Sequence, residues 1–302
     1  MQLEDLKVWV DLAETKSFSE CARLNFLTQP AISQKLKRLE TEFGAPLLAR
    51  SGKRIELTTA GKLLYEESRK IFNAYQGLRS RLKSMAGVVQ GTLKIATIYS
   101  IGLYELNPCL KHFLKKFPAV DLDVSFSHSP KIYQDLLERR IEIGFVAYPK
   151  EHSRLKILPF KNDNLILVTP PRHPLARHKQ IKINKISGFE FIGFKKDIPT
   201  RVALDKIFKK YHVEAKVKLE FDNIETVKQA VEIGAGISIL PSVTVKKEID
   251  HGLLKGVHFS NVRLPRPLAA IIRRTEPLSP PAENFIKELG SAQTQTKPLD
   301  AR

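Results

Sequence analysis

The stretch from Ser17 to Arg50, SFSECARLNFLTQPAISQKLKRLETEFGAPLLAR, decides how the first part of the chain folds. Apolar residues recur at helical spacing twice within it, and also over residues 3–15 just before it. Ser17 and Ser19 are both suited to cap the first of the two helices, and Thr28 the second, with Pro30 in its first turn. Two short helices joined by a tight turn indicate a helix-turn-helix.

The last helix of this motif has two contrasting faces. An apolar stripe is formed by Ile32, Leu36, Leu39 and Phe43. The cap and the outward positions carry hydroxyl, amide and cationic groups, which can contact base edges and phosphates in a major groove. We expect the following residues to contact DNA: Thr28, Gln29, Pro30, Ser33, Gln34, Lys37 and Arg38. The alternative is an ordinary amphipathic helix with a solvated polar face.

A basic hairpin follows this helix. Strand-like pieces at 47–48 and 55–57 flank a turn rich in cations. We expect the hairpin to be a wing that reaches the DNA backbone or minor groove through Arg50, Lys53 and Arg54. A solvated basic face is the simpler alternative.

The stretch FLTQPAISQKLKRLETEFGAPLLARSGKRIELTTAG, residues 26–61, resembles the winged helix-turn-helix of the LysR-type transcriptional regulators. The chain departs from the family pattern at Leu48, where the family usually has Phe, and this keeps an apolar contact. The resemblance implies a homo-oligomer, dimer or tetramer, that binds double-stranded DNA at an inverted-repeat operator. It also implies a small-molecule effector and RNA polymerase as partners.

A long helix is expected over residues 59–86. Its apolar residues repeat in heptads, at Leu64, Ile71, Tyr75, Leu78, Leu82 and Met85, with Ser68 as the weak member. This pattern favours a coiled coil between two chains over a helix docked on its own domain. Residues 87–91 would form a hinge. We therefore expect a DNA-binding domain over 1–58 and a linker and dimerisation segment over 59–91.

Strands and helices alternate in the remaining residues, 92–302, which predicts parallel α/β sheets. The expected strands are 92–97, 121–127, 141–147, 165–170, 191–194, 216–221, 236–241 and 268–274. The expected helices are 103–117, 131–140, 200–211, 224–234 and 282–289. The family resemblance implies an effector-binding domain of two Rossmann-like subdomains, similar to periplasmic solute-binding proteins. They would be subdomain I, about 92–162 and 266–290, and subdomain II, about 163–265.

A cleft between two such subdomains receives ligands at strand ends and helix starts. The residues expected there are Tyr99, Ser100, Ile101, His128, Ser129, Ala147, Pro199 and Thr200. Ser100, Ser129 and Thr200 also match recurrent effector contacts of the family. Hydroxyl and free N–H groups suit a small anionic effector. The alternative is that each hydroxyl only caps a helix.

Several function classes find no support in the sequence. The two cysteines and eight histidines form no ligand cluster, and phosphate-binding and nucleophile motifs are missing, so we expect no metal, no cofactor and no catalytic residue. No apolar run reaches the roughly 18 residues that a membrane helix needs. The opening MQLEDLKVWV lacks the pattern of a signal peptide, which favours the cytoplasm. The net charge of +18 invites a nucleic-acid partner, but it is spread at similar density over both parts of the chain, so it does not locate a DNA site. The alternative function is a solute-binding or enzyme-like α/β protein with an accessory DNA-binding head.

Overall fold

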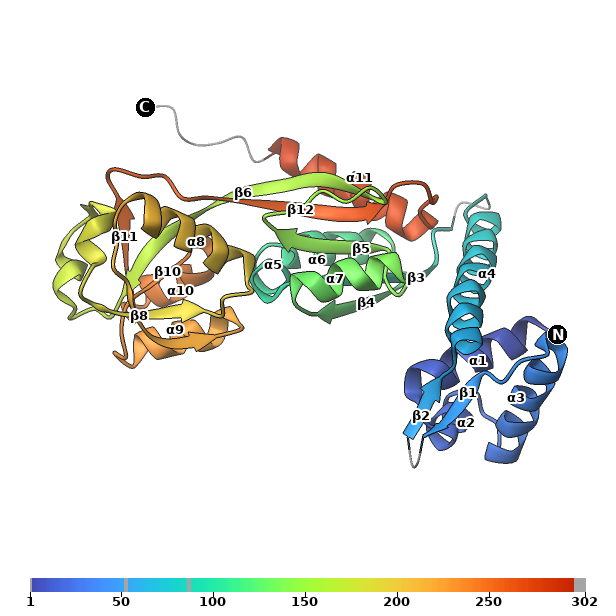
Figure 1. Ribbon diagram of the computed structural model, residues 1–302. Helices are drawn as coiled ribbons and strands as arrows, with labels where there is room; N and C mark the ends of the chain where they lie inside the picture. Colours follow the sequence, from blue (N-terminus) through green and yellow to red (C-terminus); the bar gives the residue numbers. More distant parts are fainter. Residues whose placement is uncertain (1, 52–53, 86–87, 296–302) are drawn as a thin grey trace. The chain divides into compact units, whose positions relative to one another are not determined.

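The structure is a computed structural model that describes residues 2–51, 54–85 and 88–295. The side chains of residues 50, 51, 54, 84, 85 and 291–295 lie outside this description. The chain divides into two compact units, Met1–Val89 and Gln90–Arg302 (Figure 1).

The first unit is mostly helical. Its elements are α1 (Leu3–Thr15), α2 (Phe18–Leu24), α3 (Gln29–Phe43), β1 (Leu48–Ser51), β2 (Arg54–Leu57) and α4 (Thr59–Met85). Of the two caps offered for α2, Ser17 is the cap and Ser19 lies within the helix, and the Thr28 cap of α3 is confirmed. The Ser17 hydroxyl accepts a hydrogen bond from the N–H of Glu20 at 3.3 Å, and Thr28 accepts one from the N–H of Ala31 at 3.4 Å. Gly44 ends α3 in the left-handed conformation, with φ of 63°.

Helices α1, α2 and α3 enclose a small core. Ile32 of α3 is buried against α1 and α2, and Leu39 is buried against Trp9 of α1. The predicted apolar stripe of α3 is wrong at its end, because the Phe43 side chain is 46% exposed. Phe43 is the last residue of the helix and extends past the core that covers Ile32 and Leu39.

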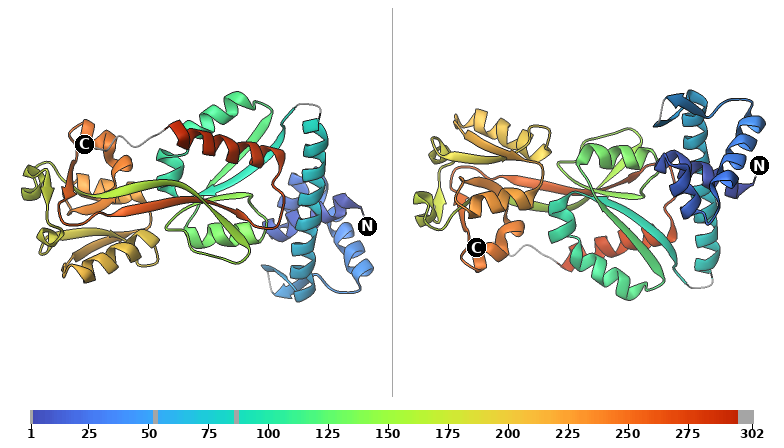
Figure 2. Two further views of the ribbon diagram at one scale, coloured as in Figure 1. Left: turned by 90° about the horizontal axis from the view of Figure 1, so that it is seen from above. Right: turned by 90° about the horizontal axis from the view of Figure 1, so that it is seen from below.

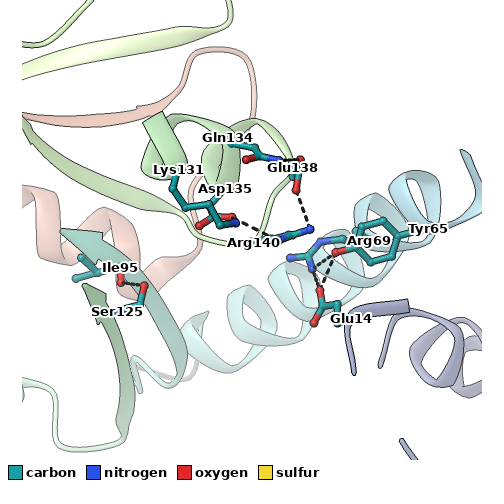
Figure 3. A network of polar contacts seen from close by, with 10 residues as sticks. All are labelled: Glu14, Tyr65, Arg69, Ile95, Ser125, Lys131, Gln134, Asp135, Glu138 and Arg140. Carbon is teal, nitrogen blue, oxygen red and sulfur yellow. Dashed lines mark hydrogen bonds and ion pairs between the residues drawn. The ribbon is translucent and has the colours of Figure 1, made fainter. Parts of the chain in front are cut away.

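The N-terminal part of helix α4 is bonded to α1, and the rest of α4 exposes apolar side chains. Glu14 of α1 accepts a hydrogen bond from the Tyr65 hydroxyl at 2.9 Å and forms an ion pair with Arg69 (Figure 3). Leu64 packs against the core of the first unit. The next heptad residues are exposed: Ile71 47%, Tyr75 41%, Leu78 54% and Leu82 59%. The Met85 side chain and residue 87 of the expected hinge lie outside the described residues.

The second unit contains the remaining strands. They are β3 (Gly91–Thr97), β4 (Val120–Phe126), β5 (Ile143–Ala147), β6 (Leu155–Thr169), β7 (Gln180–Ile181), β8 (Glu190–Phe194), β9 (Lys216–Phe221), β10 (Ser238–Pro241), β11 (Lys255–Phe259) and β12 (Pro265–Arg273). Its helices are α5 (Tyr99–Tyr104), α6 (Asn107–Lys116), α7 (Ser129–Leu137), α8 (Pro199–Lys210), α9 (Ile224–Glu232), α10 (Lys246–Asp250) and α11 (Pro280–Gln295). Short 3-10 helices occur at Pro174–Arg177, Ile183–Ile186 and Ser242–Val245.

The expectation of parallel sheets is only partly right. The main sheet has the order β4-β3-β5-β12-β6-β11-β7, with β10 also paired to β6. Strand β3 pairs in parallel with β4 and β5, and β8 with β9, as alternating strands and helices require. Strand β12 is antiparallel to β5 and β6 because the chain returns to the first sheet from the opposite direction.

The second unit has two lobes that share one pair of strands. The first lobe has a core around Ile132, Leu136 and Val146. The second lobe has cores on both faces of its strands, around Leu167 and Val168. Strands β6 and β12 form an antiparallel ribbon that runs through both lobes (Figures 1 and 2).

Two sequence predictions in this unit are wrong in detail. The expected helix 103–117 is two helices, α5 and α6, because Pro108 lacks an N–H and begins a new helix rather than continuing the old one. Strand β6 begins at Leu155, far before the predicted 165, and its first half lacks a continuous apolar run. Strands β7 and β11 were not predicted.

Candidate functional site

The outward face of α3 presents the polar residues that the sequence assigned to DNA contact. Thr28, Gln29, Pro30, Ser33, Gln34, Lys37 and Arg38 are all exposed. Gln29 donates a hydrogen bond to Ser19 of α2, and Thr28 caps the helix. The other side chains of this face are available to a ligand on the outside.

Two cations of the described helix-turn-helix form ion pairs with acidic side chains, one partly buried and one exposed, whereas Lys37 and Arg38 do not. Lys35 forms an ion pair with Asp5 at 2.5 Å and holds α3 against α1. Arg23 pairs with Glu20 one turn earlier on α2. In the described part of α3, Lys37 and Arg38 form no ion pair and remain as the exposed positive charges on the outward face. This face therefore combines hydrogen-bonding groups with two free cations, which suits duplex DNA.

The wing is present as a backbone hairpin. Strands β1 and β2 pair antiparallel, with Leu48 opposite Leu57 and Arg50 opposite Ile55. Leu48 packs on the core of the first unit, so the substitution of the family's Phe keeps its apolar contact. Lys53 and the side chains of Arg50 and Arg54 lie outside the described residues.

A cavity of about 60 Å³ lies within the second unit. This volume holds several water molecules and therefore suits a compact small molecule. Its walls come from the starts of α5, α7, α8 and α9 and from strand ends. The lining residues are Ile98, Tyr99, Ser100, Ser127, His128, Ser129, Pro130, Ala147, Phe194, Asp197, Ile198, Pro199, Thr200, Asp222, Asn223, Ile224, Pro241 and Arg266.

Seven of the eight residues predicted for the cleft line this cavity. The exception is Ile101, which is fully buried and does not reach the cavity. Helix α5 begins at Tyr99, two residues earlier than a cap at Ser100 would require, so Ile101 faces the core instead. The sequence placed the start of this helix too late.

The three hydroxyls of the cleft are not helix caps. The cap positions of α5, α7 and α8 are Ile98, His128 and Ile198, and none of the three makes a side-chain capping bond. Ser100, Ser129 and Thr200 follow within the first turns of these helices. The first N–H groups of a helix have no partner within it and carry partial positive charge. The hydroxyls and helix starts are therefore arranged as donors toward the cavity.

One lining residue was missed by sequence reasoning. Arg266, in β12, is 2% exposed, and its Nη2 donates to the Ser100 hydroxyl at 2.5 Å. Its Nε and Nη1 have no hydrogen-bond partner in the described part of the chain. Arg266 is buried between the exposed Pro265 and Pro267, and the strand is buried without alternation from Leu268 to Ile272. The sequence carries no local signal for Arg266, because its place depends on the pairing of β12 with β6.

The acidic neighbour of Arg266 is Asp163. The two residues are opposite each other in the β6–β12 ribbon, and Asp163 Oδ2 lies 3.7 Å from Arg266 Nη1. Burial raises the pKa of the Asp163 carboxyl, and Arg266 opposes that shift. Burial lowers the pKa of the Arg266 guanidinium, against the attraction of Asp163.

A second polar cluster joins the two lobes beside the cavity. The Tyr104 hydroxyl of α5 donates to Glu225 of α9 at 2.7 Å and accepts a hydrogen bond at 2.5 Å from Lys228 of the same helix. Lys228 also pairs with Glu248 at 2.7 Å. Burial lowers the pKa of Lys228, but its hydrogen bonds to Glu248, Tyr104 and Glu225 outweigh that effect, and the pKa lies above its usual range. Burial raises the pKa of Tyr104 to about 12.

Two other kinds of site find no support in the described residues. Over residues 2–51, 54–85 and 88–295, no three His, Cys, Asp or Glu side chains gather as a metal site would require. None of the helices described there combines the length and apolarity needed to cross a membrane.

Known proteins place both units in one family. Residues 3–62 match the family model of bacterial regulatory helix-turn-helix proteins of the lysR family, and residues 86–294 match the LysR substrate binding domain. The HTH-type transcriptional regulator CysL of Bacillus subtilis (strain 168) is 29% identical over 90% of this chain and 91% of its own.

Two solved structures are similar along most of their length. A full-length OxyR variant from Pseudomonas aeruginosa has a TM-score of 0.75 at 21% identity, over 100% of this chain and 99% of that one. The regulatory domain of CcmR from Synechocystis PCC6803, in complex with 2-PG, has a TM-score of 0.64 at 25% identity, over 68% of this chain and 99% of that one. The chain therefore belongs to the LysR family and is a DNA-binding transcriptional regulator with an effector-binding domain, not an enzyme.

Proposed function

We propose that this regulator is switched by a small anionic effector bound in the cleft of its second unit. The observation that carries the proposal is the convergence on one cavity of the α7 and α8 starts, which lack side-chain caps, with the hydroxyls of Ser100, Ser129 and Thr200. Donors and partial positive charge in one place favour an anion. The CcmR regulatory domain, similar over 68% of this chain, was solved with 2-PG, which supports a small-molecule ligand for this fold.

The effector contacts that we propose are those predicted residues that line the cavity. They are Tyr99, Ser100, His128, Ser129, Ala147, Pro199 and Thr200. The domain borders that we propose keep the DNA-binding domain at 1–58, the linker at 59–91 and the effector-binding domain at 92–302.

On the DNA side, we propose that α3 lies in the major groove and that two chains bind an inverted repeat. The exposed heptad side chains of α4, such as Ile71 and Leu78, are the contacts through which two chains would pair. A pair of reading helices related by two-fold symmetry requires half-sites spaced by whole turns of DNA. The regulator would act in the cytoplasm, together with RNA polymerase.

Thermal unfolding of the full chain tests the effector site. Small metabolites and inorganic anions are added one at a time, and a ligand of the folded state raises the unfolding midpoint with its concentration. We expect a compound that stabilises the wild type to stabilise the Ser129→Ala, Thr200→Ala double variant much less. An equal shift in both proteins would exclude these hydroxyls from the effector site.

A further inference from the structure

The strongest unexplained feature of the cleft is the incomplete bonding of Arg266. Its guanidinium is almost fully buried and lines the cavity, yet only Nη2 has a hydrogen bond, to Ser100. Nε and Nη1 lack a partner among the described residues. A buried charged donor without an acceptor is costly, and native structures retain such a group where a ligand, an ion or an ordered water completes it.

Asp163 is a poor partner for this charge. Its Oδ2 is 3.7 Å from Nη1, beyond hydrogen-bonding distance, and has no other partner in the described chain. Its Oδ1 is already engaged, accepting from the N–H of Asn164 at 2.7 Å and from the Ser242 hydroxyl at 3.3 Å. The two charges attract each other, but no hydrogen bond joins Asp163 to the Arg266 guanidinium.

We propose that the effector carries an oxyanion group that takes over Arg266 from Asp163. A carboxylate, phosphate or sulfate group in the cavity would accept along one edge of the guanidinium, from Nε or Nη1 together with Nη2, and stand beside the Ser100 hydroxyl. This inference rests on the proposed function, because it names the charged residue and the ion-pair exchange within the same cleft.

The exchange connects ligand binding to the lobes. Arg266 and Asp163 are opposite each other in the ribbon that both lobes share. Arg266 donates to Ser100, which belongs to the first lobe. Asp163 accepts from Ser242, which belongs to the second lobe. With the oxyanion bound, Arg266 is held toward Ser100, and Asp163 keeps only its contacts toward Ser242 and Asn164. Binding would therefore weaken the attraction between Arg266 and Asp163 and leave each residue bonded to a different lobe. A ligand-driven switch requires such a difference between the bound and the free state.

The two partners must respond with opposite signs. Replacing Arg266 by Gln removes the positive charge and the free donors, so the affinity for an oxyanion should fall about tenfold or more. Replacing Asp163 by Asn keeps its size but removes the competing charge, so the affinity should rise about threefold to tenfold. Arg266→Gln alone leaves the buried charge of Asp163 unpaired and could unfold the protein. The double variant Asp163→Asn, Arg266→Gln removes both charges, so it serves as the second test. Its affinity for an oxyanion should stay low.

Calorimetric titration of the full chain with sulfate, phosphate or acetate measures these affinities, with sodium chloride holding the ionic strength constant. Arg172→Gln is the matched control, because it removes the same charge from an exposed loop away from the cavity, and its affinities should equal those of the wild type. The acetate arm and the phosphate and sulfate arms separate a carboxylate from a tetrahedral oxyanion.

The outcomes distinguish the exchange from the proposed function. Weaker binding by Arg266→Gln together with tighter binding by Asp163→Asn supports the exchange. If the wild type binds an anion and Arg266→Gln binds it equally well, or if Asp163→Asn binds it less well, the exchange is overturned while an anion-binding cleft remains. Without saturable binding to either the wild type or Asp163→Asn, both proposals fail.

Discussion

The proposed DNA-reading surface and the proposed effector cleft differ in how the chain builds them. The reading surface comes from one segment, residues 28–38, on the exposed face of one helix. The cleft comes from segments as far apart as Ile98 and Arg266, and four helix starts contribute to it. A surface made by one helix follows from helical periodicity, whereas an assembled site depends on strand order and register.

The two sites also differ in energetic terms. Polar side chains on the exposed face of α3 keep their water until DNA replaces it, so substituting them leaves the fold almost unchanged. Buried groups such as Arg266 and Asp163 interact strongly with their surroundings, and substituting one alters the other. Variants in the reading surface should therefore change one function, and variants in the cleft should change ligand binding and stability together.

The largest expected effect comes from separating the paired reading surfaces. Replacing Ile71 and Leu78 of α4 by Lys places charge in the apolar seam through which two chains would pair. Operator affinity should fall by two orders of magnitude or more, because each reading helix would then bind alone. Sedimentation velocity and DNA-binding titrations measure both effects. An unchanged oligomer would show that α4 is not the pairing element.

A smaller effect is expected from a single base contact. Replacing Gln34 by Ala should weaken specific DNA binding by about 1–3 kcal/mol and relax the preference at one base pair. Binding to a library of operator variants measures both quantities. Gln229→Ala, an exposed amide on helix α9, is the control and should leave them unchanged. Retained preference in Gln34→Ala would mean that another face of α3 reads the DNA.

The features that depend on neighbouring residues in the chain could be predicted from the sequence. The starts of α2 and α3 are correct because Ser17 and Thr28 act locally, through capping bonds to the next turn. Phe43 was predicted to be part of the buried stripe but is exposed, because helical periodicity does not show how far the neighbouring helices extend. The break at Pro108 could have been read from its missing N–H.

The remainder depends on long-range pairing. Arg266 is one of 50 Lys and Arg residues, and only the register of β12 with β6 places it opposite Asp163 and within reach of Ser100. The antiparallel return of β12 likewise depends on the chain leaving one lobe and re-entering it. The return of the chain to the first lobe was implied by the family resemblance, but no local sequence pattern gives the antiparallel direction of β12.

The cleft hydroxyls should contribute less than the base contact. Replacing Thr200 by Ala removes one donor to the proposed anionic effector and should lower its affinity by roughly 1–2 kcal/mol. Titration with an effector found by thermal unfolding measures the loss. Val202→Thr, which adds a hydroxyl at an exposed position of α8 that does not line the cavity, is the control. Affinity equal to that of the wild type in Thr200→Ala would remove this hydroxyl from the site.

The smallest effect concerns the thiols, one in each unit. Burial raises the pKa of Cys21 to about 11 and also raises the pKa of Cys109. Because the folded pKa values are raised, the protonated thiols stabilise the fold below the unfolded pKa of about 8.5, and this contribution is lost as the pH rises toward the folded values. Ellman's reagent at pH 8 should react slowly with the native protein and fast in urea. Rapid reaction of native Cys21 would contradict its burial.

The ribbon of β6 and β12 has a mechanical consequence. Its register shifts between Leu268 and Ala269, and such a bulge bends and twists a strand pair locally. The 15 residues of β6 extend over about 50 Å, so a change of bend at the bulge would displace the ends of the ribbon more than its middle. A rotation of a few degrees there moves the far end of a lobe by about 2 Å. Arg266 stands three residues from Ala269, so the ligand proposed for its guanidinium would bind close to the point where the ribbon bends.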